Sequence, residues 1–253
     1  CHFHAYSCTL QAGRCPCDAS DGSRCGSRDL CNAIDQDGRP RPLSSQQKLS
    51  RPRGEAMFTQ RAIRRMKPDP IPLDDIKTLL EAAVKAPNGG NAQPARFLVV
   101  NERGKIQALG KLYLEAWWAK RREMQGWQSI TDIPPEDKIY LAATRFAESF
   151  GEVPLVVLPV APRGTSANSV FPWLQNMMLA ARALGIGSVL TTLHPPVDAR
   201  VAQLFGIPED VEIFGCVPMG YPRGRFGPTS RKPITELAFF NEWGGETPWD
   251  AGC

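Results

Sequence analysis

The sequence lacks the features that would place it in a membrane, in a secretory pathway or on nucleic acid. No apolar run approaches the roughly 20 residues that a helix needs to span a bilayer. No basic stretch followed by an apolar one opens the chain, and we therefore expect a cytoplasmic protein. The net charge of +4 is small and scattered along 253 residues, which argues against nucleic acid as a partner.

Metal-binding and phosphate-loop patterns are also missing. Six of the eight cysteines fall within residues 1–31, yet no two of them form a C-x-x-C pair, so we expect no metal site. His194 is the only histidine after residue 4, and we interpret it as an ordinary loop or strand-end residue. Neither G-x-G-x-x-G nor G-x-x-x-x-G-K occurs, which argues against a Rossmann or Walker nucleotide site.

The composition changes near residue 57. Residues 1–56 are rich in Cys, Arg, Asp, Ser, Gly and Pro, with no sustained period of 2 or 3.6, and we interpret them as a disordered or artefactual leader. Met57 precedes the first organised segment and is the expected start of the protein proper. Residues 57–243 are expected to form one folded domain, and residues 244–253 a tail.

Helical and strand-like patterns alternate through this domain. Apolar residues at spacings of 3 and 4 predict helices at 73–84, 104–125, 134–150, 169–184 and 197–205. Short apolar runs predict strands at 97–100, 153–160, 189–195 and 211–219. The 153–160 strand is expected to be buried on both faces, and the 169–184 helix to lie at the centre of the protein. A short helix is also predicted over 58–66, with Thr59 as its cap.

The loop from Ala86 to Phe97, A-P-N-G-G-N-A-Q-P-A-R-F, has the composition of a ligand-binding loop. Its paired glycines permit backbone angles closed to other residues, and they let a ligand approach the main chain. Its two asparagines and one glutamine supply amides that both donate and accept hydrogen bonds. Such a loop suits a flat heterocycle with several carbonyl and imide groups, although an ordinary helix-to-strand turn remains the alternative.

Two arginine-rich segments are candidate phosphate ligands. Residues 58–66, F-T-Q-R-A-I-R-R-M, carry three cations within five positions, and Arg231 lies in a basic loop at 220–233 with several Gly and Pro. Guanidinium groups match the geometry of phosphate oxygens. The alternative for both segments is a solvated basic face.

Taken together and in this order, the segments resemble the FMN-dependent nitroreductase family. Residues 58–97 look like its opening signature: an Arg-rich start, a Pro-rich connector, a helix, and a P-S/N-G-G-N-x-Q-P loop. The similarity continues through 169–193 and 220–233. The resemblance implies an α+β fold with a central, mainly antiparallel sheet flanked by helices. It also implies an intertwined homodimer with FMN at the dimer interface.

The resemblance further implies which residues contact the FMN. One subunit would supply the phosphate, N1–O2 and N5 contacts: Arg61 and Arg231 at the phosphate, Arg64 near the N1–O2 edge, and the backbone of Thr192 and Leu193 near N5. Ala62 would be a further cofactor-binding residue. The other subunit would supply loop residues: Pro87, Asn88, Gly89 and Asn91.

Three positions depart from the family pattern. Gln60 replaces a frequent second Arg, Ala62 stands where Ser is frequent, and Ala95 stands where Trp usually follows Q-P and is expected to leave room beside the loop. We expect these changes to retune the substrate or the redox potential and to leave FMN binding intact.

The function that the resemblance implies is that of an FMN oxidoreductase. NADH or NADPH would give hydride to flavin N5, and a nitroaromatic, quinone or similar planar acceptor would then take it in a ping-pong cycle. No catalytic side chain is required, because the flavin carries the chemistry. The sequence leaves open the acceptor, the choice of nicotinamide, and three alternatives: another branch of the superfamily (reductive dehalogenation or flavin fragmentation), a flavin-sequestering protein, and a basic nucleic-acid binder.

Overall fold

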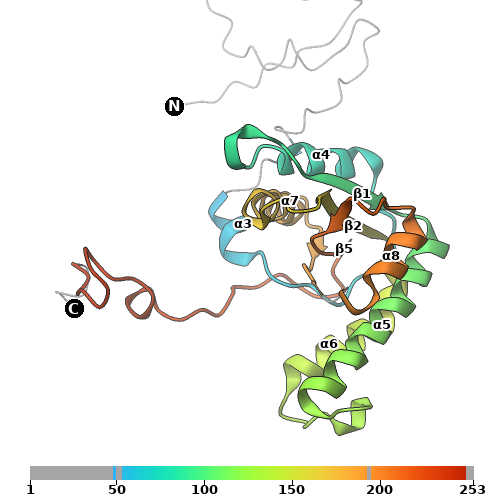
Figure 1. Ribbon diagram of the computed structural model, residues 1–253. Coiled ribbons are helices and arrows are strands. Elements are labelled where there is room, and N and C mark those ends of the chain that lie inside the picture. Colours follow the sequence, from blue (N-terminus) through green and yellow to red (C-terminus); the bar gives the residue numbers. More distant parts are fainter. Residues whose placement is uncertain (1–47, 50–52, 193–194, 249–253) are drawn as a thin grey trace, which may run out of the picture. The chain divides into compact units, whose positions relative to one another are not determined.

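A five-stranded sheet organises the computed structural model, which describes residues 48–49, 53–192 and 195–248 (Figure 1). Residues 1–47 and 50–52, Leu193, His194 and the last five residues lie outside the described ranges. The strands are β1 (Arg96–Val100), β2 (Leu155–Pro162), β3 (Gly187–Ser188), β4 (Val211–Ile213) and β5 (Val217–Gly220).

Strand β2 lies at the middle of this sheet. β1 pairs along one of its edges, while β5 and β4 follow one another along the other edge, and β3 pairs with β5. All four strand pairs are antiparallel. The mainly antiparallel sheet predicted from the sequence is therefore confirmed.

Helices cover both faces of the sheet (Figure 1). The helices are α3 (Arg53–Thr59), α4 (Leu73–Ala83), α5 (Arg103–Gln125), α6 (Lys138–Ser149), α7 (Phe171–Ala183) and α8 (Asp198–Phe205). Short 3₁₀ helices are η1 (Gly89–Asn91), η2 (Ile130–Asp132), η3 (Phe150–Glu152), η4 (Ala167–Ser169), η5 (Pro195–Val197) and η6 (Ile234–Glu236). The α+β class expected from the sequence is confirmed.

The two cores explain the sequence of β2. Val156 and Leu158 belong to the core with α5, α6 and α8, whereas Leu155 and Val157 belong to the core with α4 and α7. Successive side chains of a strand point to opposite faces, so a strand between two helical layers must be apolar throughout. The prediction of a strand buried on both faces is confirmed.

Helix α7 is the central helix that its pattern predicted. Trp173, Leu174 and Met177 are almost fully buried against α4 and the sheet. The helix ends where Gly185 takes a left-handed backbone angle, φ 75°, which turns the chain into β3.

The helix predicted over 58–66 is wrong. Helix α3 ends at Thr59, and the chain beyond it is extended, because the backbone N–H of Ile63 donates to the carbonyl oxygen of Ser188 at 2.9 Å. Thr59 is therefore a last helical residue, and its hydroxyl donates to the carbonyl oxygen of Glu55. The three arginines of this segment do not share a helix face.

The strand predicted at 189–195 is misplaced. Strand β3 lies just before it. After β3, the backbone N–H of Val189 donates to the carbonyl oxygen of Pro218 at 3.2 Å, and Thr191 forms a bridge with Cys216. Helix α3, in turn, begins at Arg53, before the domain start expected at Met57.

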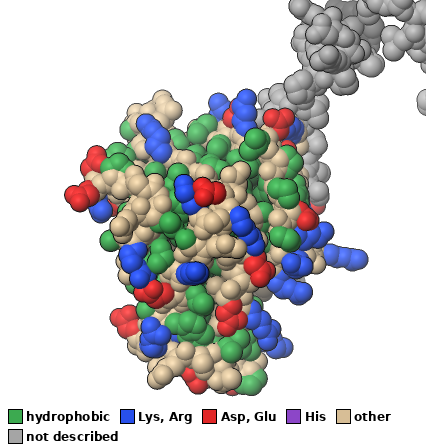
Figure 2. All heavy atoms as spheres, turned by 90° about the vertical axis from the view of Figure 1, so that its right-hand side faces the viewer, with side chains coloured by type: hydrophobic (Ala, Val, Ile, Leu, Met, Phe, Trp, Pro, Cys, Tyr) green, Lys and Arg blue, Asp and Glu red, His purple; other side chains and the backbone are tan. Residues whose placement is uncertain are grey.

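Charges are mixed on the face of the molecule that α5 and α8 occupy. Basic and acidic side chains alternate there with apolar ones, without a continuous stripe of either sign (Figure 2). Among the described helices, none combines the length and the apolar character that crossing a membrane would need.

Helix α5 approaches η3 closely at a pair of glycines. A Cβ atom on Gly110 would lie 2.7 Å from the backbone nitrogen of Gly151 and 2.9 Å from its Cα. Gly104, in the first turn of the same helix, has open space, since the nearest atom to its Cβ position is a side-chain oxygen of Glu102 at 3.9 Å. Gly110 and Gly104 therefore offer a crowded and an open position for the same substitution within one helix.

We expect Gly110→Ala to lower the free energy of unfolding by about 1–3 kcal/mol, because the added methyl group forces two backbones apart. Gly104→Ala is the control, and it is expected to raise that free energy by up to about 1 kcal/mol, since alanine is the better helix former. Urea unfolding followed by circular dichroism measures both. Equal effects of the two substitutions would contradict the close contact.

Candidate functional site

Residues 58–67 pair with the segment that follows β5. The backbone N–H groups of three residues donate across this pairing: Thr229 to Phe58 (3.3 Å), Arg223 to Arg65 (2.9 Å), and, in the opposite direction, Lys67 to Tyr221 (2.8 Å). The basic loop at 220–233 therefore runs antiparallel along the arginine segment. Two stretches more than 150 residues apart in the chain are brought side by side.

Arg61 lies against this basic loop. Its Nη1 is 3.8 Å from the position that a Cβ atom on Gly227 would take. Arg231 follows two residues after Thr229, which is bonded to Phe58, and its own Nη1 donates to the carbonyl oxygen of Ser230 at 2.8 Å. Both arginines are exposed, and no carboxylate within the described ranges pairs with either.

The segment 188–192 forms the next wall of this region. Ala62 bridges to Ser188, and Thr191 exchanges two backbone hydrogen bonds with Cys216, of 2.9 and 2.8 Å. The exposed Thr192 follows directly, and Leu193 lies outside the described ranges. The pairing thus joins the arginine segment to the residues expected near flavin N5.

Tyr113 of α5 reaches the same segment. Its hydroxyl donates to Oγ1 of Thr191 at 3.3 Å, and its ring stacks on Phe150 at 4.4 Å between centroids. Burial raises the pKa of Tyr113, while the Thr191 hydrogen bond and the positive charge of Arg64 act to lower it. Arg64 lies between Ile63, whose backbone is bonded to Ser188, and Arg65, whose backbone is bonded to Arg223.

The loop after α4 is held in a strained conformation. Asn91 and Gln93 have left-handed backbone angles, φ 53° and 49°, which are unusual for residues other than glycine. The side-chain oxygen of Asn88 accepts the backbone N–H of Gln93 at 2.8 Å and so fixes the bend. Ala95 is only 2% exposed and packs in the core with α4 and α7, so the room that we expected beside the loop is filled.

This loop lies at the opposite end of α7 from the arginine segment. The backbone N–H of Gly89 donates to Ser169 Oγ at 3.1 Å, just before the helix begins. Near its other end, Arg182 contacts Thr59. Thirteen residues of helix rise roughly 20 Å. The structure therefore brings together Arg61, Ala62, Arg64, Thr192 and the Arg231 loop, but within one chain it does not bring Pro87, Asn88, Gly89 or Asn91 to them.

Two side chains that touch this region, Tyr113 and Arg182, were not among the residues expected at the site. A cation within the otherwise apolar stripe of a central helix is a signal that could have found Arg182, because a buried charge needs partners.

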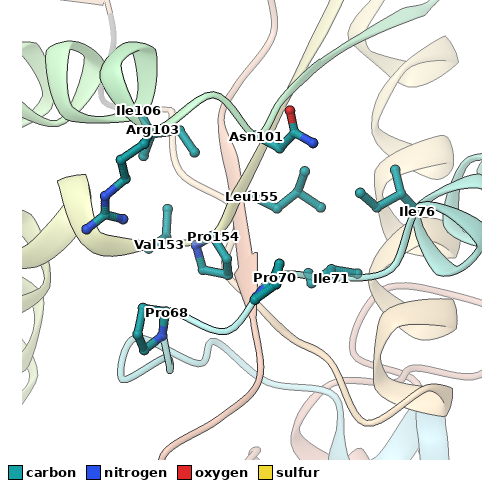
Figure 3. Close-up of a pocket in the computed structure, with 10 residues that line it drawn as sticks. All are labelled: Pro68, Pro70, Ile71, Ile76, Asn101, Arg103, Ile106, Val153, Pro154 and Leu155. Carbon is teal, nitrogen blue, oxygen red and sulfur yellow. The ribbon is translucent and has the colours of Figure 1, made fainter.

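A separate pocket of about 170 Å³ lies where the Pro-rich connector meets the ends of β1 and β2 (Figure 3). Its walls are mostly apolar, and the two polar lining residues, Asn101 and Arg103, point in different directions. None of the residues expected at the cofactor lines it. Within the described ranges, no group of three His, Cys, Asp or Glu could hold a metal ion.

Comparison with known proteins identifies the family. The model of the nitroreductase family matches residues 58–221. A protein of Archaeoglobus fulgidus, provisionally named NADH dehydrogenase/NAD(P)H nitroreductase, is 27% identical over 176 residues, which cover 66% of this chain and 83% of the relative. Iodotyrosine deiodinase of Thermotoga neapolitana is 28% identical over 171 residues, covering 64% and 84%.

Solved structures share the fold. The FMN-dependent nitroreductase NfnB of Mycobacterium smegmatis, in complex with NADPH, matches with a TM-score of 0.59 at 22% identity, covering 75% of this chain and 97% of that one. The fold thus defines an α+β protein of the nitroreductase type. The chain belongs to the nitroreductase family, as the sequence predicted.

We expect Gly227→Leu to raise the dissociation constant for FMN, the cofactor implied by the sequence, by about tenfold or more, because the new side chain meets the guanidinium of Arg61. Gly224→Leu is the control in the same loop, since no atom lies within 4 Å of its Cβ position. Flavin fluorescence titration measures both affinities. An unchanged affinity in the Gly227 variant would show that the cofactor does not use this loop.

Proposed function

We propose that this protein is an FMN-dependent oxidoreductase that uses NADH or NADPH to reduce a nitroaromatic, a quinone or a similar planar acceptor. The observation that carries the proposal is the pairing of residues 58–67 with 221–229, which places Arg61 beside the basic loop. Membership of the nitroreductase family supports it, and so does the fold shared with an FMN-dependent nitroreductase.

The exposed cations of this region fit the phosphate of FMN. That phosphate carries close to two negative charges, and two guanidinium groups suit it in charge and in geometry. Arg61 and Arg231 are exposed, without a carboxylate partner among the described residues, and Gly227 has no side chain to crowd them. Ala62 lacks the hydroxyl common in the family, but its backbone is held by Ser188.

The chain's own residues would orient the ring and set its charge environment. Bound FMN supplies the chemistry, accepting hydride from the nicotinamide and passing it to the acceptor. Arg64 would face the N1–O2 edge, where a positive charge favours the negative charge that gathers there. The backbone of Thr192 and Leu193 would lie near N5. The hydroxyl of Tyr113 donates a hydrogen bond to Thr191, the residue before them.

A homodimer is part of the proposal. In one chain, helix α7, roughly 20 Å long, separates the loop that carries Asn88 and Asn91 from the segment that carries Arg61, so a second chain would supply that loop if both groups contact one FMN. The segment after Arg231 extends away from the sheet (Figure 1), and several of its apolar side chains are exposed. These are Ile234, Leu237, Phe239, Phe240 and Trp243, the last being 91% exposed. Such a surface favours burial against another copy of the chain.

Reductive dehalogenation is the second candidate function. Iodotyrosine deiodinase of Thermotoga neapolitana is among the relatives. A solved iodotyrosine deiodinase bound to FMN and 3-iodo-L-tyrosine shares the fold, with a TM-score of 0.61 at 23% identity over 76% of this chain and all of that one. Iodide release from 3-iodotyrosine separates this candidate from acceptor reduction.

We expect the purified protein to bind FMN, to lose flavin colour anaerobically with NADH or NADPH, and to regain it when a nitroaromatic or a quinone is added. Absorbance spectra during stepwise additions measure all three. No binding of added FMN would contradict the proposal. Bound FMN that neither nicotinamide bleaches would indicate a flavin-sequestering protein instead.

Mixed dimers test whether two chains build each site. Arg61→Gln and Asn88→Ala are each expected to lose FMN, but their equimolar mixture, refolded together, should regain about a quarter of the sites. Half of the dimers are then mixed, and each mixed dimer holds one intact site. Bound flavin per chain is the measurement.

The control mixture combines Arg61→Gln with Arg231→Gln. Because both residues belong to one side of the site, no mixed dimer restores it, and bound flavin should stay low. Recovery in the control, or none in the first mixture, would contradict a site shared in this way.

A further inference from the structure

Arg182 is a buried cation near the end of the central helix. It is 6% exposed, although α7 is otherwise buried through apolar side chains. Its Nη2 donates to Glu55 Oε1 at 2.9 Å, and its Nε donates to Thr59 Oγ1 at 2.8 Å. The central carbon of its guanidinium lies 4.1 Å from the centre of the Phe226 ring.

These partners belong to the two segments that meet at Arg61. Glu55 and Thr59 lie on α3, whose last residue is two positions before Arg61. Phe226 precedes Gly227, against which the Arg61 guanidinium lies. A single guanidinium group therefore contacts both the helix that leads to one proposed phosphate ligand and the loop that carries the other.

The chemistry of these contacts makes the arrangement rigid. A hydrogen bond from a guanidinium to a carboxylate is charge-assisted, and burial away from water strengthens it. The face of the guanidinium covers an aromatic ring, which adds a cation–π attraction. The guanidinium uses two of its nitrogens and its flat face at once, which a lysine ammonium cannot reproduce.

We propose that Arg182 is a positioning residue for the FMN phosphate. It holds α3 and the basic loop in the register that lets Arg61 and Arg231 act on one anion, and it does not itself touch the cofactor. This inference rests on the proposed function, because it assigns a role only in a chain that binds FMN.

Riboflavin separates a phosphate-positioning role from a merely structural one. It carries the same ring as FMN but no phosphate. Loss of general stability weakens both flavins together, whereas loss of the phosphate geometry weakens FMN alone. The ratio of the two dissociation constants therefore reports on Arg182 in a way that protein stability does not.

We expect Arg182→Met and Arg182→Lys, in the full chain, to raise the dissociation constant for FMN by about tenfold or more, with that for riboflavin changed less than about threefold. Fluorescence titrations with each flavin give the two constants. Phe226→Leu removes the ring contact and leaves the buried charge in place, and it should shift the ratio of the two dissociation constants in the same direction. This variant provides the test where the arginine variants do not fold.

Arg200→Met is the matched control. It removes an ion pair with Glu115 in which both side chains are about half exposed, and it should leave the ratio unchanged. The inference would be overturned if the wild-type chain prefers FMN and the Arg182 and Phe226 variants keep this preference. The proposed function would then still stand. A wild-type chain that binds neither flavin would overturn both.

Discussion

The candidate site depends on the backbone pairing between residues 58–67 and 221–229. These hydrogen bonds, with that from Ile63 to Ser188, make the arginine segment extended and fix which side chains face the basic loop. The partners are separated by 125 to 171 positions along the chain. Loop-closure entropy grows only slowly with loop length, so pairing over such a distance costs little more than pairing over a shorter one. A folded sheet that already holds β3 and β5 together lowers that cost further.

Helix α7 sets the second constraint. Ser169, just before its N-terminal end, holds the Asn88 loop, and Arg182 at its C-terminal end holds α3. A helix of this length is a rigid spacer, so motion of a side chain cannot bring the two ends of it to one ligand. A ligand is therefore bound either by the Arg61 segment of one chain alone or by that segment together with the Asn88 loop of a second chain. The strained backbone at Asn91 and Gln93 favours the second possibility, because strain of this kind persists where a function requires it.

The sequence predicted the features that depend on residues close together in the chain. It did not predict those that depend on residues far apart in the chain. Helices α4 to α8 and strand β2 were predictable from local sequence, because a helix with one buried face shows a period of 3.6 and a strand buried on both faces is a short continuous apolar run. The 58–66 helix was predicted wrongly, since local propensity allows a helix there and the competing partner, Ser188, is remote. Tyr113 and Arg182 were missed for the same reason. The motif resemblance supplied the residues expected at the cofactor, but only the folded structure shows that the Asn88 loop lies at the other end of α7.

Two departures from the family pattern, Gln60 and Ala62, reduce the number of groups available to bind the proposed phosphate. Gln60 stands where a second arginine is frequent, and its side-chain nitrogen lies 3.7 Å from the sulfur of Met178, against α7. The segment therefore carries one cation fewer next to Arg61, and Ala62 offers no hydroxyl in its place. With fewer ligands, each remaining charge-assisted bond carries a larger share of the binding free energy, and its geometry matters more. A buried arginine that fixes helix α3 and the basic loop together is the kind of compensation that such a site requires.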